Sequence, residues 1–319
     1  MTYSIVARDK ETGNLGVAVQ SHYFGVGRLV PWGLAGVGVV ATQSFVEPSY
    51  GARGLELLKN CNDPRAVLDD LLELDAGSQT RQVSILNSEG KIASHTGSSC
   101  IAAAGHVVGD GVSAQANLVE SEKVWFAMIE EFESSAESFA LCLLNVLKSA
   151  ELMGGDIRGK QSAAILIVRG EATGRLQDDR VLDLRVDDSD DPLIELERLM
   201  KNSDALGCLV ELLETDGLFK GKLTAPPHVV ESALLKLSEA QLILGPSNRE
   251  ASIWRGLLLS RAGRDFEAAR DLSFAYESNS RVPLLIRRLS DSGMWNRSGS
   301  ELEKLLELLD FQVMSRGFD

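Results

Sequence analysis

Two short segments at the start of the chain decide its fold: Met1-Thr-Tyr-Ser-Ile-Val-Ala-Arg-Asp9 and Leu15-Gly-Val-Ala-Val-Gln-Ser-His22. Both are rich in apolar and β-branched residues, and a Gly-containing stretch separates them, so they predict an antiparallel β-hairpin. Thr2 directly follows the initiator methionine. Removal of Met1 would give this one residue both a nucleophilic hydroxyl and a free α-amine that can serve as the base. The alternative is that Thr2 is an ordinary strand start.

The composition limits the classes of protein to which the chain can belong. Its 319 residues suffice for about two domains, and no apolar run approaches the roughly 20 residues of a membrane span. With no signal-peptide pattern, we expect a cytoplasmic protein without membrane contact. A net charge of −14 argues against binding to nucleic acids. The cysteines and histidines show no metal-ligand spacing, so we expect neither a metal nor another cofactor.

The order of predicted elements indicates the fold class. Strand-rich segments alternate with pairs of helices, and Asp63-Pro64 starts one helix as N-cap and first position. Right-handed βαβ winding uses single crossover helices, so a Rossmann-type sheet is disfavoured. Helix pairs that cover two facing sheets predict an α+β fold, a four-layer αββα sandwich. The strands are expected at residues 3–8, 15–21, 34–45, 81–86, 91–95, 100–106, 112–117, 162–168 and 180–186, and residues 29–32 form a short apolar stretch.

The last third of the chain reads as helical. An acidic, turn-rich boundary ends the sandwich domain (residues 1–192), and two amphipathic helices, 193–202 and 205–214, fall in a helical linker (residues 193–219). No strand pattern follows in the final domain, residues 220–319. Residues 247–280 match a 34-residue helix–turn–helix repeat of tetratricopeptide (TPR) type. A plain helical bundle is the alternative, because apolar spacings of three and four serve both architectures.

Polar side chains follow two of the predicted strands, at points where a substrate site can form. Ser21 and His22 end one apolar strand, and Gln43 and Ser44 end another. Side chains at neighbouring strand ends can converge, so Ser21, His22 and Gln43 are predicted to bind substrate. Ser44 is a catalytic candidate that would orient the attacking water. The alternative for all four is strand-end capping and turn hydrogen bonding.

Later segments add further candidates. Gln115 and Asn117 lie two residues apart in an extended segment, so their amides share one face. These amides are either structural or donors to a substrate oxygen, and Asn117 is the catalytic oxyanion candidate. His106 is a candidate acid or base, unless its glycine-rich stretch is a surface loop. Arg158 and Gln161 are predicted to contact substrate, Arg158 through a carboxylate, although Arg158 fits an internal salt bridge equally well.

Several of these motifs occur together in a known family. They are Tyr-Ser-Ile-Val-Ala-Arg-Asp, Leu-Gly-Val-Ala-Val-Gln-Ser-His, Ala-Thr-Gln-Ser-Phe, Gln115-Ala-Asn and Gly155-Asp-Ile-Arg-Gly-Lys-Gln-Ser-Ala-Ala. In this combination, over about residues 1–200, the chain resembles the bacterial and archaeal domain-of-unknown-function 1028 (DUF1028) family. The final domain lies outside the resemblance and looks like an accessory module.

The resemblance implies a fold similar to the N-terminal nucleophile (Ntn) hydrolases. In that superfamily an N-terminal Thr, Ser or Cys opens the first strand and cleaves amide bonds through an acyl-enzyme, and Thr2 is the matching residue. Ntn hydrolases of proteasome type also use a lysine on a neighbouring strand. The corresponding stretch, residues 29–45, contains no lysine, and only Arg28 lies beside it.

Three hypotheses follow for function. The first is an Ntn-type amidohydrolase that cleaves a small amide or peptide through Thr2. The second is a catalytically inactive scaffold whose helical repeats hold a partner protein or peptide. The third is a hydrolase that uses an internal Ser or His and retains Met1. A homo-oligomer is compatible with all three.

Overall fold

The computed structural model describes residues 2–295, 297 and 299–316. The chain divides into two compact units, Met1–Arg198 and Leu199–Asp319. The division falls inside helix α6 (Pro192–Glu214), a single helix where the sequence predicts two. Ser203 and Asp204, between the two predicted helices, are weak helix formers that do not break a helix. The domain boundaries inferred from the sequence stay predictions.

The first unit contains a six-stranded antiparallel sheet with the order β10-β9-β2-β1-β8-β7. The predicted hairpin forms its centre, with Tyr3 opposite Gln20 and Arg8 opposite Leu15. The strands are β1 (Thr2–Arg8), β2 (Leu15–Ser21), β7 (Gly105–Gly109), β8 (Val112–Asn117), β9 (Ser162–Val168) and β10 (Arg180–Val186). Strand β1 therefore has a partner on each side.

A second, four-stranded antiparallel sheet has the order β3-β4-β5-β6. Its strands are β3 (Pro31–Leu34), β4 (Gly38–Ser44), β5 (Arg81–Asn87) and β6 (Ile92–Thr96). The expected strand 34–45 is thus divided at residues 35–37. Gly36 there has φ 72°, a left-handed conformation that suits a tight turn.

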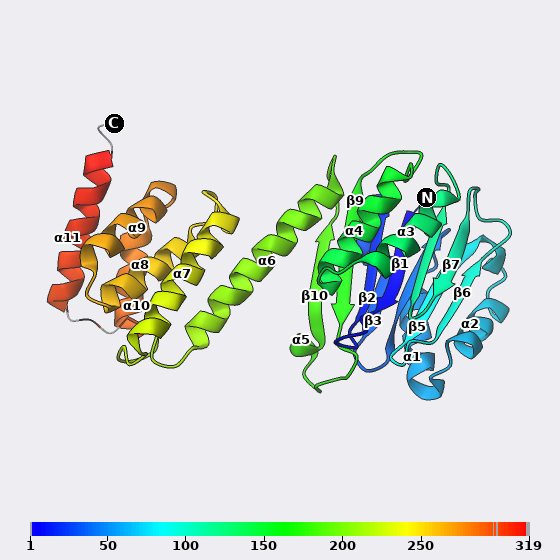
Figure 1. Cartoon of the computed structure of the whole chain (residues 1–319), viewed down its shortest axis with the longest axis horizontal. Helices are drawn as coiled ribbons and strands as arrows, with labels where there is room; N and C mark the ends of the chain where they lie inside the picture. Colours follow the sequence, from blue (N-terminus) through cyan, green and yellow to red (C-terminus); the bar gives the residue numbers. More distant parts are fainter. Residues whose placement is uncertain (1, 296, 298, 317–319) are drawn as a thin grey trace. The chain divides into compact units, whose positions relative to one another are not determined.

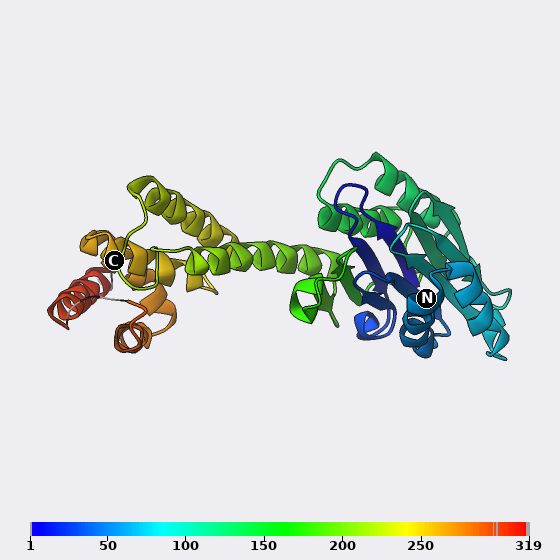
Figure 2. The same ribbon diagram turned by 90° about the horizontal axis from the view of Figure 1, so that it is seen from below.

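Two helix pairs cover the outer faces of the two sheets. Helices α1 (Ser49–Cys61) and α2 (Pro64–Glu73) pack on the four-stranded sheet, and α3 (Lys123–Ser134) and α4 (Phe139–Leu152) pack on the other. The two views of the ribbon show these four layers (Figures 1 and 2). The predicted αββα sandwich is confirmed. So is the N-cap of α2, where the Asp63 carboxylate accepts hydrogen bonds from two backbone N–H groups.

Short elements complete the sandwich, and one predicted strand is wrong. The short helices are η1 (Val26–Arg28), η2 (Ser78–Thr80) and α5 (Leu176–Asp179). The sequence predicts a strand over residues 100–106, but strand β7 begins only at Gly105. Residues 100–104 form bends because their backbone groups bond to neighbouring loops: the Leu118 N–H donates to the Ile101 carbonyl at 2.9 Å.

The second unit is all helical, as predicted. Its helices are α7 (Pro227–Leu244), α8 (Glu250–Arg261), α9 (Asp265–Ser278), α10 (Val282–Asp291) and α11 (Gly299–Arg316). Helices α8 and α9 form the helix–turn–helix of residues 247–280, and its assignment as a TPR stays a prediction. Gly256 lets these helices approach closely, because a Cβ there would lie 2.7 Å from Leu272 Cγ. Among the described residues, no helix has the length and apolarity that a membrane span requires.

Candidate active site

The layer between the two sheets has two chemically different halves. One half, here called the apolar half, is packed with aliphatic side chains from both sheets. Its members include side chains of β2, β9 and β4: Leu15, Val17, Val19, Val39, Leu166 and Val168. This half is an ordinary hydrophobic core, in which burial of apolar area supplies the stability.

The other half, here called the polar half, is filled with amides and hydroxyls. Its members come from β1, β2, β4, β5, β6, β7 and β8, and all are buried except the half-buried Thr96 and His106. They are Thr2, Ser4, Ser21, Gln43, Gln82, Ser84, Ser94, Thr96, His106, Ser113, Gln115 and Asn117. Buried polar groups must find hydrogen-bond partners, and in this half the partners are largely one another.

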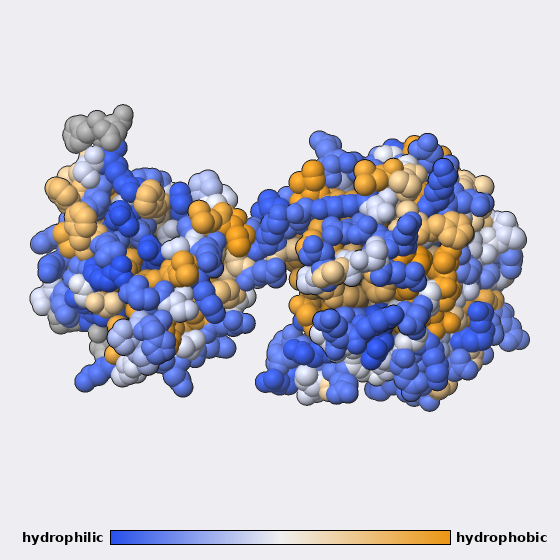
Figure 3. All heavy atoms as spheres, in the orientation of Figure 1, coloured by the Kyte–Doolittle hydropathy of each residue, from blue (hydrophilic) through white to orange (hydrophobic). Residues whose placement is uncertain are grey.

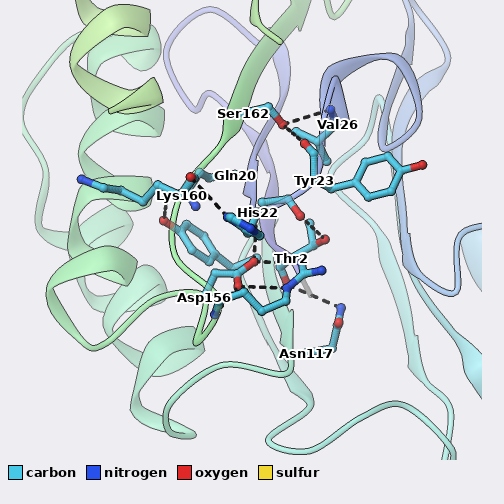
Figure 4. A network of polar contacts seen from close by, with 12 residues as sticks. Thr2, Gln20, His22, Tyr23, Val26, Asn117, Asp156, Lys160 and Ser162 are labelled. Atoms are coloured by element: carbon cyan, nitrogen blue, oxygen red, sulfur yellow. Dashed lines mark hydrogen bonds and ion pairs between the residues drawn. The ribbon is translucent and has the colours of Figure 1, made fainter. Parts of the chain in front are cut away.

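Thr2 heads β1 at one end of the polar half. Its side-chain hydroxyl donates to Ser21 Oγ at 3.1 Å, and the residue is only 6% exposed. Its carbonyl oxygen accepts hydrogen bonds from Gln43 Nε2 at 3.2 Å and from Asn117 Nδ2 at 3.5 Å. Figure 4 shows Thr2 with Asn117 and Asp156 nearby. The residue that faces Thr2 from the neighbouring sheet is therefore an amide, Gln43.

Gln82 connects the two sheets within the polar half. Its Oε1 accepts from Gln43 Nε2 at 2.8 Å and from Asn117 Nδ2 at 2.9 Å. Its Nε2 donates to Thr96 Oγ1 at 2.9 Å and to the carbonyls of Gly105 and Ala116 at 3.0 and 2.9 Å. One side chain thus holds β4, β6, β7 and β8 in register.

Gln115 forms the second cross-sheet link. Its Nε2 donates to Ser4 Oγ at 3.2 Å and to the Ala41 carbonyl at 3.1 Å, while its Oε1 accepts from Ser84 Oγ at 2.9 Å. An amide has two N–H donors, so both are engaged inside the protein. The geometry therefore argues for the structural alternative at Gln115 and against donation to a substrate oxygen. Asn117 is also bonded within the layer, although it lies beside Thr2.

A charged cluster lies next to this end of β1. The Asp156 carboxylate is fully buried and accepts from the backbone N–H of His22 at 2.8 Å. It also pairs with the guanidinium of Arg158, at 3.2 Å from Nη2 and 3.3 Å from Nε. The internal salt bridge weighed for Arg158 is therefore present. The side chain remains 38% exposed, so the predicted contact with substrate stays open.

The other predicted residues lie further from Thr2. His22 has its ring Nδ1 3.4 Å from the Lys160 carbonyl, and Gln161 Nε2 donates to Asp188 at 3.1 Å. Ser44 ends β4 with φ 72°, and alternation along the strand directs Gln43, not Ser44, toward Thr2. The structure thus brings Ser21, Gln43 and Asn117 together with Thr2, and leaves Ser44, Gln161 and His106 outside that group.

His106 lies on β7, two strands away from Thr2. Adjacent strands are about 4.8 Å apart, so the backbones are separated by about 10 Å. The His106 ring is linked to the polar half through Nδ1, which lies 2.8 Å from Thr96 Oγ1. Burial lowers the pKa of His106, and the charges of His95 and Arg65 lower it further. Near pH 7 the imidazole is therefore held in its neutral form, and its Nδ1 is connected to the polar half through Thr96.

A second buried polar group lies on the opposite face of β1. The Tyr3 hydroxyl donates to Glu151 Oε2 at 2.7 Å and contacts Gln20 Oε1. Burial, with a further contribution from the Glu151 carboxylate, raises the pKa of Tyr3 well above its usual value. Tyr3 therefore stays protonated and anchors β1 to α4. Within the described residues, no group of three or more His, Cys, Asp or Glu side chains is arranged to hold a metal ion.

Sequence reasoning missed Gln82, Ser84 and Asp156. A signal for the first two was present: polar residues at i and i+2 recur in the buried strands, as in Thr2/Ser4 and Gln82/Ser84. Such alternation inside a sandwich indicates a polar inner face. Asp156 carried no comparable signal, because it lies in a glycine-rich loop whose partners come from distant segments.

The fold and site define the chain as a mixed α+β protein with an αββα sandwich and a helical unit. The family model described as a family of unknown function (DUF1028) matches residues 2–196, so the chain belongs to this family. A crystal structure of a DUF1028 protein from Silicibacter pomeroyi is 30% identical, with a TM-score of 0.58, and the alignment covers 63% of this chain and 85% of that one. The helical unit lies almost entirely outside the matched residues.

Two more distant structures are also similar. A mutant of Anbu from Hyphomicrobium sp. strain MC1 is 15% identical, with a TM-score of 0.35, over 67% of this chain and 99% of that one. Anbu, an ancestral beta-subunit, from Yersinia bercovieri is 12% identical, with a TM-score of 0.32, over 68% and 98%. No curated protein matches the chain.

Proposed function

We propose that the sandwich is an Ntn-type hydrolase that cleaves an amide bond through Thr2 after removal of Met1. The observation that carries this proposal is the position of Thr2. It heads the central strand β1, and its hydroxyl lies 3.1 Å from the Ser21 hydroxyl at the end of the polar half. A second hydroxyl at this distance can pass a proton between the nucleophile and its surroundings.

The proposed reaction needs only groups of this chain, substrate and water. The freed α-amine of Thr2 takes the proton of its own hydroxyl, and Oγ1 adds to the amide carbonyl. The C–N bond then breaks, and the departing amine takes the proton from the ammonium group. Water, deprotonated by the same amine, adds to the resulting ester and releases the acid and free Thr2. Asn117 is the proposed oxyanion donor and would exchange its 3.5 Å bond to the Thr2 carbonyl for one to the oxyanion, whereas Gln43 and Gln115 hold the two sheets together.

The test is a pair of measurements on the full-length protein. Intact-mass spectrometry is expected to show the loss of one methionine residue, and Thr2→Ala is expected to abolish hydrolysis of an amide substrate. Ser21→Ala should lower kcat by about 10²-fold, which is the usual size of one proton-transfer contact. Unchanged hydrolysis by Thr2→Ala would sink the proposal. If His106→Ala then lost activity, the hydrolase with an internal base would take its place.

One observation favours the inactive scaffold as the second candidate. Gln43, an amide already bonded to Gln82, contacts the Thr2 carbonyl, and the stretch of residues 29–45 that contains it has no lysine. Retention of Met1 in the mature protein, together with capture of a peptide by the helical unit, would support the scaffold. The four cysteines carry no disulfide, and we propose a reducing, cytoplasmic setting for either function.

A further inference from the structure

The end of the sandwich that holds Thr2 differs in surface chemistry from the opposite end. We define the Thr2 end by the strand residues that meet there: Thr2, Ser21, Asn117 and Ser162 in one sheet and Gln43 in the other. The loops at the opposite end, residues 9–14, 87–91, 109–111 and 169–175, are rich in charged side chains. The loops at the Thr2 end also carry charges, as in residues 156–160 and 187–191, but they carry large exposed apolar side chains as well.

Five exposed apolar side chains surround the Thr2 end. Each lies in a loop that leaves one of the strands or segments around Thr2: Tyr23, Phe24, Phe45, Ile101 and Ile157. Figure 3 shows hydrophobic groups interspersed with hydrophilic ones along the upper edge of the sandwich, at the end where Figure 1 marks the N-terminus, and a mostly hydrophilic lower end. Single exposed apolar residues are ordinary, but a group at one site marks a binding surface.

A pocket of about 500 Å³ opens at the same end. Its walls are small side chains and backbone together with the hydrogen-bonding side chains of Thr96, Ser98 and His106. The lining residues are Thr96, Gly97, Ser98, Cys100, Ala102, Ala104, Gly105 and His106. This volume is within the range of small-molecule sites, about 300–1,000 Å³. None of these described lining residues bears a charge at neutral pH, because burial keeps His106 neutral. A charged ligand group would lose its hydration here without gaining a counter-ion.

The pocket lies within reach of Thr2. The strand register pairs Gly105 with Ala116 and Ala116 with Tyr3, so Ala104 is level with Asn117 and Thr2. Two strand spacings separate Ala104 from Thr2, which is about 10 Å. An extended peptide advances about 3.3 Å per residue, so roughly three residues connect the two points.

We propose that this pocket and the five apolar side chains bind the substrate, and that the substrate is an amide flanked by uncharged, apolar side chains, as in an extended hydrophobic peptide. The inference rests on the proposed function, since it takes Thr2 as the reacting residue. Phe45 and Ile101 border the path from Thr2 to the pocket, and the pocket receives a side chain about three residues from the scissile bond.

Binding to the full-length Thr2→Ala protein tests the inference without turnover. Calorimetric titration uses three probes: N-acetyl-Leu-Leu-Leu-amide and the analogues with Lys or Glu in place of the outer leucines. The trileucine probe is expected to bind at least tenfold more tightly than either charged probe. Equal affinities, or tighter binding of a charged probe, would overturn the inference.

Variants with matched controls locate the binding. Ala104→Leu fills the pocket and should weaken trileucine binding at least tenfold, whereas Ala52→Leu on the exposed face of α1 should not change it. Ala102→Leu, at an exposed position of the same pocket, serves if the first variant does not fold. Phe45→Ser should weaken binding about fivefold. Its control is Phe126→Ser on α3, since these phenylalanines are 56% and 57% exposed.

Two further outcomes separate the inference from its rivals. If Phe45→Ser dissociates an oligomer in light scattering and leaves trileucine binding unchanged, the apolar side chains are a contact between copies of the chain and the inference fails. The proposed function fails separately. If the protein prefers the apolar probe in binding but the unsubstituted protein hydrolyses nothing, the pocket is supported and the proposed reaction is ruled out. If hydrolysis is lost in Thr2→Ala but does not depend on the charge of the probe, the reaction is supported and the apolar pocket is ruled out.

Discussion

The apolar and polar halves of the layer between the sheets occupy the same fold but hold it together differently. In the apolar half, side chains such as Leu15 and Leu166 gain from leaving water, and this gain hardly depends on direction. In the polar half, each amide must meet a particular donor or acceptor, as Gln82 does with Gln43 and Asn117. The apolar half therefore supplies stability that tolerates small shifts, and the polar half fixes the register of the two sheets around Thr2.

This difference explains why a candidate nucleophile lies at the polar end. A hydroxyl or amine buried among aliphatic side chains would lose its hydration without compensation. Among amides and hydroxyls it keeps hydrogen bonds and a defined orientation. The comparison predicts that substitutions in the polar half disturb geometry, and that substitutions in the apolar half cost stability alone.

The largest effect is expected from Gln82→Leu. The substitution removes the link between the sheets and leaves the Gln43 and Asn117 amides and two backbone carbonyls without this partner. At about 1–3 kcal/mol for each buried group left unsatisfied, we expect a loss of about 4 kcal/mol in the free energy of unfolding. Urea denaturation measures it, with the exposed Gln177→Ala as control. A loss below about 1 kcal/mol would mean that the polar half is not cooperative.

Leu15→Ala tests the apolar half. Leu15 is fully buried, and a buried Leu→Ala change costs about 3 kcal/mol through lost burial and the cavity that remains. Hydrolysis at a temperature where the variant is folded should be unchanged, because no register contact is lost. Leu152→Ala, at a side chain that is 82% exposed, is the control. Altered substrate binding in the Leu15 variant would contradict the division of roles.

Ser84→Ala should have a smaller effect. The change removes the donor to Gln115 Oε1 and one member of a cluster with Ser94 and Ser113. One buried acceptor without its donor costs about 1.5 kcal/mol, which thermal unfolding can resolve. Ser134→Ala, on the exposed surface of α3, provides the baseline. If the two variants unfold at the same midpoint temperature, the remaining hydroxyls have rearranged to donate a hydrogen bond to Gln115 Oε1.

The smallest effect is expected from pH. Burial lowers the pKa of His106 in the folded state below the ordinary value of about 6.5. Below pH 6.5 the unfolded chain therefore binds a proton that the folded protein resists, and stability falls as the pH decreases from about 7 toward 5. His106→Gln, which cannot titrate, should flatten this part of the stability curve. If the free energy of unfolding of the variant depends on pH as steeply as that of the original protein, groups other than His106 cause the pH dependence.

Much of the fold can be predicted from local patterns. The alternation in residues 2–8 and 15–21, the Asp63-Pro64 helix start and the paired helices are all local, and they lead to the αββα sandwich. The errors fall where tertiary contacts override local preference. Residues 100–104 have strand-like composition, yet their backbone groups bond to other loops.

The site was less predictable than the fold. Thr2 follows from its place in the chain, and Ser21, Gln43 and Asn117 follow from their positions at strand ends. Gln82 and Asp156 reach the site from separate segments, and their roles depend on register across two sheets. No local pattern contains that register, because it is set by the joint packing of strands that are far apart in sequence.

The sequence by itself determined that Thr2 opens a strand, that this strand is half of a hairpin, and that helix pairs enclose the sheets. These properties depend on periodicity and chain order. Only the tertiary structure decided which amides are occupied in holding the sheets together and which groups lie beside Thr2. It also decided that apolar side chains from separate loops gather at one end. The physical reason is that a hydrogen bond depends on a few tenths of an ångström, a precision that only the packed strands provide.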